Sequence, residues 1–194
     1  MDLYGHSEPV DADTRVDDYG LRRLTAHIRD RFHAVHRREL ADAIILARRV
    51  EQEHAADPAC PKGLADHLQK MLALIDTHQR KEEMVIFPAL LAGRYHALAR
   101  PLQQMAIEHA AIDRLRLGLV EQLDRSQPGA DAGVRWRLLH TLGRKIDADL
   151  REHARLEDEI LYPRCAEFAS AQRWGPEAGL EAPHEASSSR VSQG

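Results

Sequence analysis

Hydrophobic residues recur every three or four positions along most of this chain, and this spacing predicts amphipathic helices rather than strands. Helix-ending residues separate the periodic segments: Asp57-Pro58 after the first, Gly93 after the second and Pro128-Gly129 after the third. Such short connections place consecutive helices antiparallel to one another. The predicted helices span roughly 19–57, 62–92, 97–126 and 132–169.

The predicted fold is therefore all-α, an up-down-up-down antiparallel four-helix bundle, in which cofactor sites form from side chains that face the central axis. The bundle is expected to occupy residues 19–170 as one domain. Residues 1–18 are polar, and the sequence predicts a disordered tail over 171–194.

Two of the predicted helices have a core-facing seam that a histidine and a glutamate interrupt. His78 and Glu82 stand in the second helix, and His153 and Glu157 stand in the fourth. The segments HQRKEEMVIFP and HARLEDEILYP share their His, Glu, aromatic and Pro positions. This agreement is an internal repeat of one helical hairpin.

Each of the other two helices has a single histidine on a comparable seam. His33 precedes His78 by 45 residues, and His109 precedes His153 by 44 residues. Two hairpins related by a pseudo-two-fold axis would bring both sets to one level of the bundle, which predicts two metal ions. The predicted ligands are His33, His78, Glu82, His109, His153 and Glu157.

A buried carboxylate is costly unless it is paired or coordinates a metal ion. Imidazole and carboxylate ligands without thiolates are typical of iron or manganese rather than structural zinc, and we expect iron. Six ligands leave each metal short of a full shell, so an oxo or hydroxo bridge and a small molecule can complete it. The alternative is that both His-Glu pairs are ordinary helix-surface pairs at i, i+4 spacing.

Charge and composition exclude several other classes of function. A net charge of -4 and a pI near 6.3 give no broad attraction for nucleic acid. We expect no membrane partner and a cytoplasmic location, because no stretch reaches the roughly 18 consecutive apolar residues of a membrane span. Cys60 and Cys165 form neither a disulfide framework nor a CxxC motif.

Four motifs across residues 21–165 resemble those of a known family. They are HIRDRFHAVHR, THQRKEEMVIFP, QMAIEH and REHARLEDEILYP. The chain resembles the hemerythrin-like HHE cation-binding domain and, within it, the iron-sulfur cluster repair di-iron proteins linked to nitrosative and oxidative stress. The resemblance implies a non-haem di-iron centre that helps to restore damaged iron-sulfur proteins.

The sequence departs from relatives of this kind at two points. Oxygen-carrying hemerythrins have an HxxxH pair on the third helix, whereas His109 is followed four residues later by Asp113. Repair proteins carry an N-terminal module with a CxxCC-type motif, and the sequence here has none, which leaves open whether a partner supplies those cysteines. Two alternatives stay open: a sensor or store that binds O2 or NO, and a di-iron nitric oxide reductase or peroxidase.

Other residues near the motifs are expected to lie outside the ligand set. His54 lies 21 residues beyond His33, which is about 31 Å along a straight helix, so it is predicted to have a structural role at the helix end. Glu108 is expected to be a solvated helix residue. Phe87 and Tyr162 are expected to pack beneath the site.

Overall fold

The computed structural model describes residues 18–165 and residue 167, so the expected terminal segments lie outside the described residues, apart from Asp18 at the start of α1. The described chain is helical except for short turns. Its α-helices are α1 (Asp18–His27), α2 (Ala34–Glu53), α3 (Leu64–Lys81), α4 (Phe87–Leu91), α5 (Ala99–Arg125) and α6 (Val134–Arg155). Its other helical segments are η1 (Ile28–His33), η2 (Glu82–Ile86) and η4 (Leu156–Leu161), which are π-helical, and the 3-10 segment η3 (Tyr95–Leu98).

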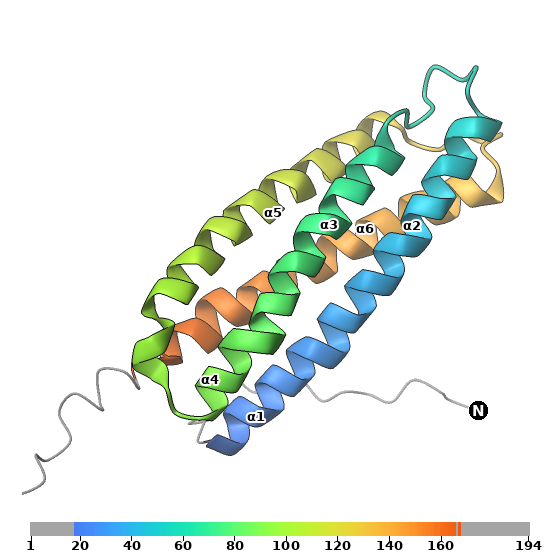
Figure 1. The fold of residues 1–194 in the computed structure, drawn as a ribbon. Coiled ribbons are helices and arrows are strands. Elements are labelled where there is room, and N and C mark those ends of the chain that lie inside the picture. The colour runs from blue at the N-terminus through green and yellow to red at the C-terminus, as the bar shows by residue number, and fades with distance from the viewer. Residues whose placement is uncertain (1–17, 166, 168–194) are drawn as a thin grey trace, which may run out of the picture.

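These segments join end to end into four long helical rods, which run antiparallel to their neighbours along the chain (Figure 1). The first rod is α1–η1–α2, the second α3–η2–α4, the third η3–α5 and the fourth α6–η4. α2 packs against α3 and α6, and α5 packs against the same two helices on the other side. The predicted up-down-up-down bundle is therefore confirmed.

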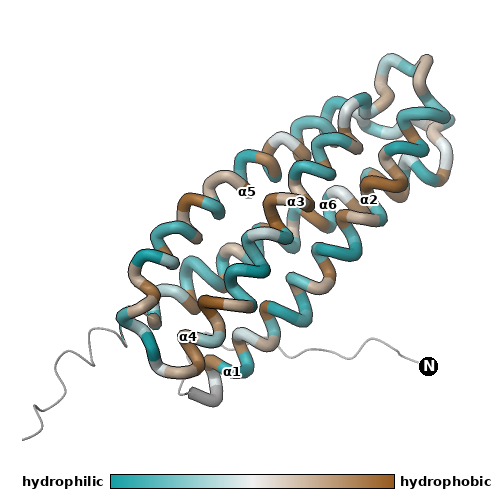
Figure 2. The backbone as a smooth tube through the Cα atoms, viewed as in Figure 1, coloured by the Kyte–Doolittle hydropathy of each residue, from teal (hydrophilic) through white to brown (hydrophobic). Residues whose placement is uncertain are grey.

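The interior contains two apolar clusters, which follow from the three- and four-residue alternation of hydrophobic and hydrophilic positions along each rod (Figure 2). The upper cluster, near the turn between α2 and α3, includes Leu40, Met71, Leu119 and Trp136. The lower cluster, near α1 and α4, is built from Leu21, Leu24, Ile28, Phe32, Ile86, Phe87, Ala89, Leu90, Tyr95, Leu98, Met105, Leu156, Leu161 and Cys165. Every predicted ligand lies in sequence between a residue of one cluster and a residue of the other.

Two of the π-helical segments end just before a proline, with a single aromatic residue between the segment and the proline. η2 precedes Pro88 and η4 precedes Pro163. A proline inside a helix lacks an N–H and its ring collides with the carbonyl four residues earlier, so a wider turn before it removes the collision. The prediction of regular α-helix through these positions is therefore wrong in detail. Both repeats place their glutamate at or beside the start of a π-helical turn.

No helix within residues 18–165 is both long enough and apolar enough to cross a membrane.

An ion pair beside the interior connects the first and fourth rods. Arg31 on η1 donates to both carboxylate oxygens of Asp149 on α6 at 3.1 and 2.8 Å, and Lys145 donates to the same group at 2.8 Å. Burial alone would raise the pKa of Asp149, but the bonds from Arg31 and Lys145 outweigh it and hold this pKa below 3.8. The lowered pKa means that Asp149 stabilises the fold above pH 3.8 and that this stabilisation is lost as pH falls through the folded-state value.

Replacing Asp149 by Asn should therefore lower the free energy of unfolding at pH 7 by about 1 kcal/mol, since both cationic partners are partly exposed. The difference in free energy of unfolding between wild type and Asp149→Asn should become smaller below pH 3.8. Urea unfolding at a series of pH values measures both effects, with the exposed Asp131→Asn as the matched control. A gap that stays constant down to acid pH would contradict this role.

Candidate metal centre

A layer of buried polar side chains separates the two apolar clusters. His33, His78, Glu82 and Glu157 are at most 1% exposed, and His153 is 5% exposed. His109 is half-buried. The structure thus brings all six predicted residues to one level of the bundle, one or two from each rod: His33 from η1, His78 from α3, Glu82 from η2, His109 from α5, His153 from α6 and Glu157 from η4.

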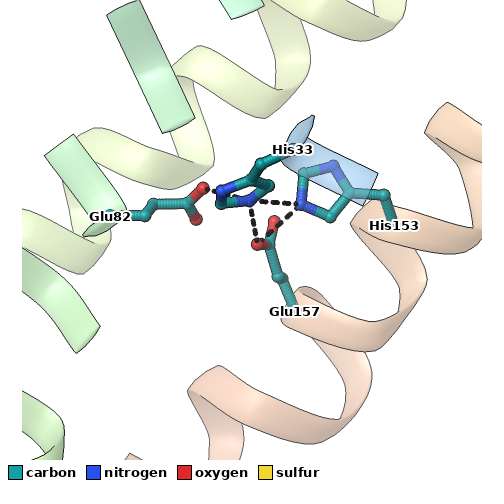
Figure 3. Close-up of side chains that lie close together, drawn as sticks. All are labelled: His33, Glu82, His153 and Glu157. Atoms are coloured by element: carbon teal, nitrogen blue, oxygen red, sulfur yellow. Dashed lines mark hydrogen bonds and ion pairs between the residues drawn. The ribbon is translucent and has the colours of Figure 1, made fainter. Parts of the chain in front are cut away.

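One group of potential ligand atoms comes from the first, second and fourth rods (Figure 3). It consists of His33, Glu82, His153 and Glu157, whose donor atoms all lie within 4.8 Å of one another. The Nε2 atoms of His33 and His153 face each other at 3.1 Å. Two nitrogens bound to one metal ion at about 2.1 Å and at right angles would also lie about 3 Å apart.

A second group contains His78, Glu82, His109 and Glu157, again with donor atoms within 4.8 Å. The Nε2 atoms of His78 and His109 are 3.0 Å apart. Glu82 and Glu157 belong to both groups, so each carboxylate lies between the two histidine pairs. Among the described residues, these are the clusters of His, Cys, Asp and Glu side chains with metal-binding spacing.

The carboxylates have unused oxygen atoms that fit metal coordination. Oε2 of Glu82 and Oε2 of Glu157 are buried and make no hydrogen bond. An anionic oxygen without a partner in the interior is strongly destabilising, and coordination of a cation removes that cost. Because both His-Glu pairs are buried, the alternative of ordinary helix-surface pairs is wrong.

Three outer carboxylates contact the histidine rings, and the sequence did not predict these contacts. Nδ1 of His33 donates to Glu83 at 2.8 Å, and Nδ1 of His109 donates to Asp158 at 2.8 Å. These acids follow Glu82 and Glu157 directly, so each repeat carries an acid immediately after its glutamate. Histidines that bind metals commonly make this second contact to a carboxylate, which directs Nε2 toward the ion.

The third outer carboxylate is Glu108, which the sequence analysis expected to be solvated. That expectation is wrong, because Glu108 is only 7% exposed. It accepts hydrogen bonds from Nδ1 of His78 at 3.2 Å, from Lys81 at 2.5 Å and from Gln104 at 2.8 Å. Its neighbours on two rods, which local sequence does not reveal, exclude it from water.

Protonated histidines balance the buried carboxylates in the metal-free protein. Burial lowers the pKa of His33, but the nearby Glu157 and Glu82 carboxylates outweigh it and raise this pKa to about 9. Burial likewise lowers the pKa of His109, while Asp158 and Glu157 raise it to about 10. The pKa of Glu157 is well below 4.5, since the attraction of the nearby His153, His109 and His33 overcomes the effect of burial. The carboxylates thus stabilise positive charge on the histidines. A metal ion that binds there displaces the protons and supplies the positive charge instead.

Removing an outer carboxylate should weaken metal binding without abolishing it. We expect Glu83→Gln and Asp158→Asn each to raise the metal dissociation constant about 10- to 100-fold, because Nδ1 loses its anionic acceptor. Competition with a chelator of known affinity measures the change. Glu159→Gln is the matched control, since Glu159 is exposed and pairs with Arg155. Equal affinities in all three variants would contradict the orienting role.

Aromatic rings cover the histidines from the lower cluster. Phe32 stacks on His153 with ring centroids 5.4 Å apart, and Phe87 stacks on His33 at 5.8 Å. Tyr162 stacks on His109 at 5.9 Å, and its hydroxyl also donates a hydrogen bond to Glu82. Both repeated aromatic residues therefore pack against the layer, and Tyr162 contacts it with a polar atom as well.

His36 and His54 are among the described histidines that lie outside these groups. His36 is fully buried, accepts a hydrogen bond from Gln79 at 3.1 Å and lies beside His153, with ring centroids 5.3 Å apart. His54 directly follows the last residue of α2, and its ring packs on Trp136 with centroids 4.9 Å apart. Trp136 belongs to the upper cluster, so His54 lies at the end of the bundle, away from the polar layer.

A small cavity of about 50 Å³ reaches the layer between α5 and α6. Its walls include His78, His109 and His153 together with apolar side chains such as Ile112 and Leu150. A cavity of this volume has room for a few water-sized molecules, so it can accommodate a diatomic molecule.

Asp113, which stands where oxygen carriers have a histidine, lies at the wall of this cavity. Its carboxylate accepts a hydrogen bond from Nε of Arg116 at 2.7 Å, and the same arginine donates to Asp147 at 2.5 Å. Asp113 is absent from both groups of potential ligand atoms. This wall therefore carries an ion-paired arginine.

Comparison with known proteins gives a family match over most of the chain. The Hemerythrin HHE cation binding domain matches residues 24–165. The iron-sulfur cluster repair protein YtfE of Yersinia pestis (strain Pestoides F) is 35% identical over 146 residues, which cover 75% of this chain and 66% of the relative. The protein of the same name from Yersinia pseudotuberculosis serotype O:1b (strain IP 31758) has the same identity and coverage. The match thus spans just under two thirds of the length of these relatives.

Proposed function

Because the chain belongs to the hemerythrin HHE cation-binding domain family, we propose that its polar layer holds a non-haem pair of iron ions. His33 and His153 bind one ion, and His78 and His109 bind the other. Glu82 and Glu157 bridge the two. The single observation that carries this proposal is that both buried carboxylates belong to both groups of donor atoms.

The donor set favours iron over the common alternatives. Two imidazoles and two carboxylate oxygens for each ion, with no thiolate, are typical of iron or manganese sites with open positions. Structural zinc sites instead are closed tetrahedra that are usually rich in cysteine. When bound, a pair of irons supplies redox chemistry and exchangeable positions for small ligands. The surrounding residues orient the ligands and exclude bulk water.

For this centre we propose a role in the repair of iron-sulfur clusters under nitrosative or oxidative stress. The support is the likeness to the relatives named for cluster repair, together with a carboxylate-rich cluster whose donor atoms have metal-binding spacing and include no thiolate. The partners are iron-sulfur proteins whose clusters have been damaged.

A reactivation assay tests this role. An iron-sulfur dehydratase inactivated by nitric oxide is mixed with the iron-loaded chain and a thiol, and its activity is followed over time. Recovery well above that with free ferrous iron at the same concentration is the expected result. Recovery no better than with free iron, in the presence of thiol, would exclude the repair role while leaving the metal centre intact.

A second candidate function is reversible binding of O2 or NO, and the 50 Å³ cavity beside three of the histidines favours it. If gas enters there, Ala154→Leu should slow gas binding to the reduced iron form at least about tenfold by filling the cavity. The matched control is Ala148→Leu on the exposed face of the same helix. Stopped-flow absorbance measures the rates, and equal rates in both variants would exclude this route.

A further inference from the structure

The two repeats place an aromatic residue at the same position, but only one carries a hydroxyl. Phe87 stacks on His33 with an interplanar angle of 18°, and Tyr162 stacks on His109 at 20°. The packing of the two rings is thus nearly equivalent across the pseudo-two-fold axis. The hydroxyl of Tyr162 breaks this equivalence.

That hydroxyl donates a hydrogen bond to Oε1 of Glu82. Oε1 therefore accepts a hydrogen bond, while Oε2 of the same group makes none.

The two shared carboxylates consequently face the histidine pairs in different ways. Glu157 directs one oxygen to each pair: Oε1 lies 2.8 Å from Nε2 of His153, and Oε2 lies 3.2 Å from Nε2 of His109. Glu82 directs the same oxygen to both pairs. Its Oε2 lies 3.4 Å from Nε2 of His33 and 3.5 Å from Nε2 of His78.

We propose that Tyr162 is a positioning residue that occupies Oε1 of Glu82, so that Glu82 bridges the two metal ions through one oxygen while Glu157 uses two. This inference deepens the proposed function and rests on the metal pair described there. Four imidazoles and three carboxylate oxygens then hold the ions. Each ion then has two imidazoles and two carboxylate contacts, but one oxygen of Glu82 serves both ions and Oε1 of Glu82 is withheld from them.

The rate of metal release from Tyr162→Phe distinguishes this role from one in which Tyr162 only holds Glu82 in place. In Tyr162→Phe, Oε1 of Glu82 stays buried but loses the hydroxyl that donates to it. A bound metal ion is then the partner that can replace the hydroxyl. Metal release should therefore become slower, by about 2- to 10-fold. If Tyr162 merely supported Glu82, its loss would loosen the ligand and make release faster.

The experiment compares wild type, Tyr162→Phe and the control Tyr95→Phe, a substitution of another buried tyrosine in the lower cluster. Each protein is loaded with ferrous iron under anaerobic conditions, its iron content is measured, and release to a chromogenic chelator is timed. Slower release from Tyr162→Phe alone is the expected result. Equal or faster release, with two ions bound in wild type, would overturn the role of Tyr162 and leave the centre standing. Fewer than two ions in wild type would overturn both.

Infrared spectra of wild type give a second readout that does not depend on the variant. Loaded-minus-free difference spectra should contain two classes of metal-bound carboxylate stretch, one for a group that binds through one oxygen and one for a group that binds through two. A single class in wild type would contradict the proposal.

Discussion

Glu157→Gln should remove both metal ions rather than one. Glu157 belongs to both groups of donor atoms, and its two oxygens face different histidine pairs. An amide is a much weaker ligand than a carboxylate and lacks the negative charge that balances the cations. We expect the affinity for each ion to fall by more than about 100-fold, since loss of an outer carboxylate alone costs up to that factor.

Metal analysis after desalting measures this effect, and the exposed Glu159→Gln serves as the control. His153→Ala gives a useful contrast, because His153 belongs to one group only and its loss should affect one ion more than the other. Retention of one tightly bound ion by Glu157→Gln would show that the carboxylate is not shared.

Metal loading should stabilise the fold by several kcal/mol. A ligand that binds only the folded state adds about 4 kcal/mol to the free energy of unfolding when its free concentration is 1,000 times the dissociation constant. Two such ions add about twice that value. The structure gives the physical reason: Glu82 and Glu157 each leave one buried oxygen without a hydrogen bond in the metal-free protein.

Urea unfolding of the iron-loaded protein and of the same protein after chelation measures this difference. The variant with both Glu82→Gln and Glu157→Gln controls for metal binding elsewhere, and its stability should not depend on iron. A wild type equally stable with and without iron would exclude strong binding within the bundle.

The sequence predicted the fold and the six proposed ligands because both depend on a local, repeated pattern. The apolar seams determine which face of each helix is buried, and the His-xxx-Glu repeat marks where polar residues interrupt that face. His54 could be set apart by the rise of a helix alone. Its packing on Trp136 agrees with that argument.

Other features of the site depend on contacts between rods and could not be predicted in this way. Glu108 on α5 is buried where this helix packs against α3, and its bonds to His78 and Lys81 cross from α5 to α3. Two local signals were nevertheless present. Pro88 and Pro163 mark the wider turns before them, and the second acid in each repeat marks the outer carboxylates.

The most direct test of the central claim is the iron content of the full chain after expression with iron and purification without chelators. The shared positions of Glu82 and Glu157 predict about two iron ions per chain, bound together. A protein that retains no iron, or that binds one ion without a second under iron excess, would contradict the di-iron account.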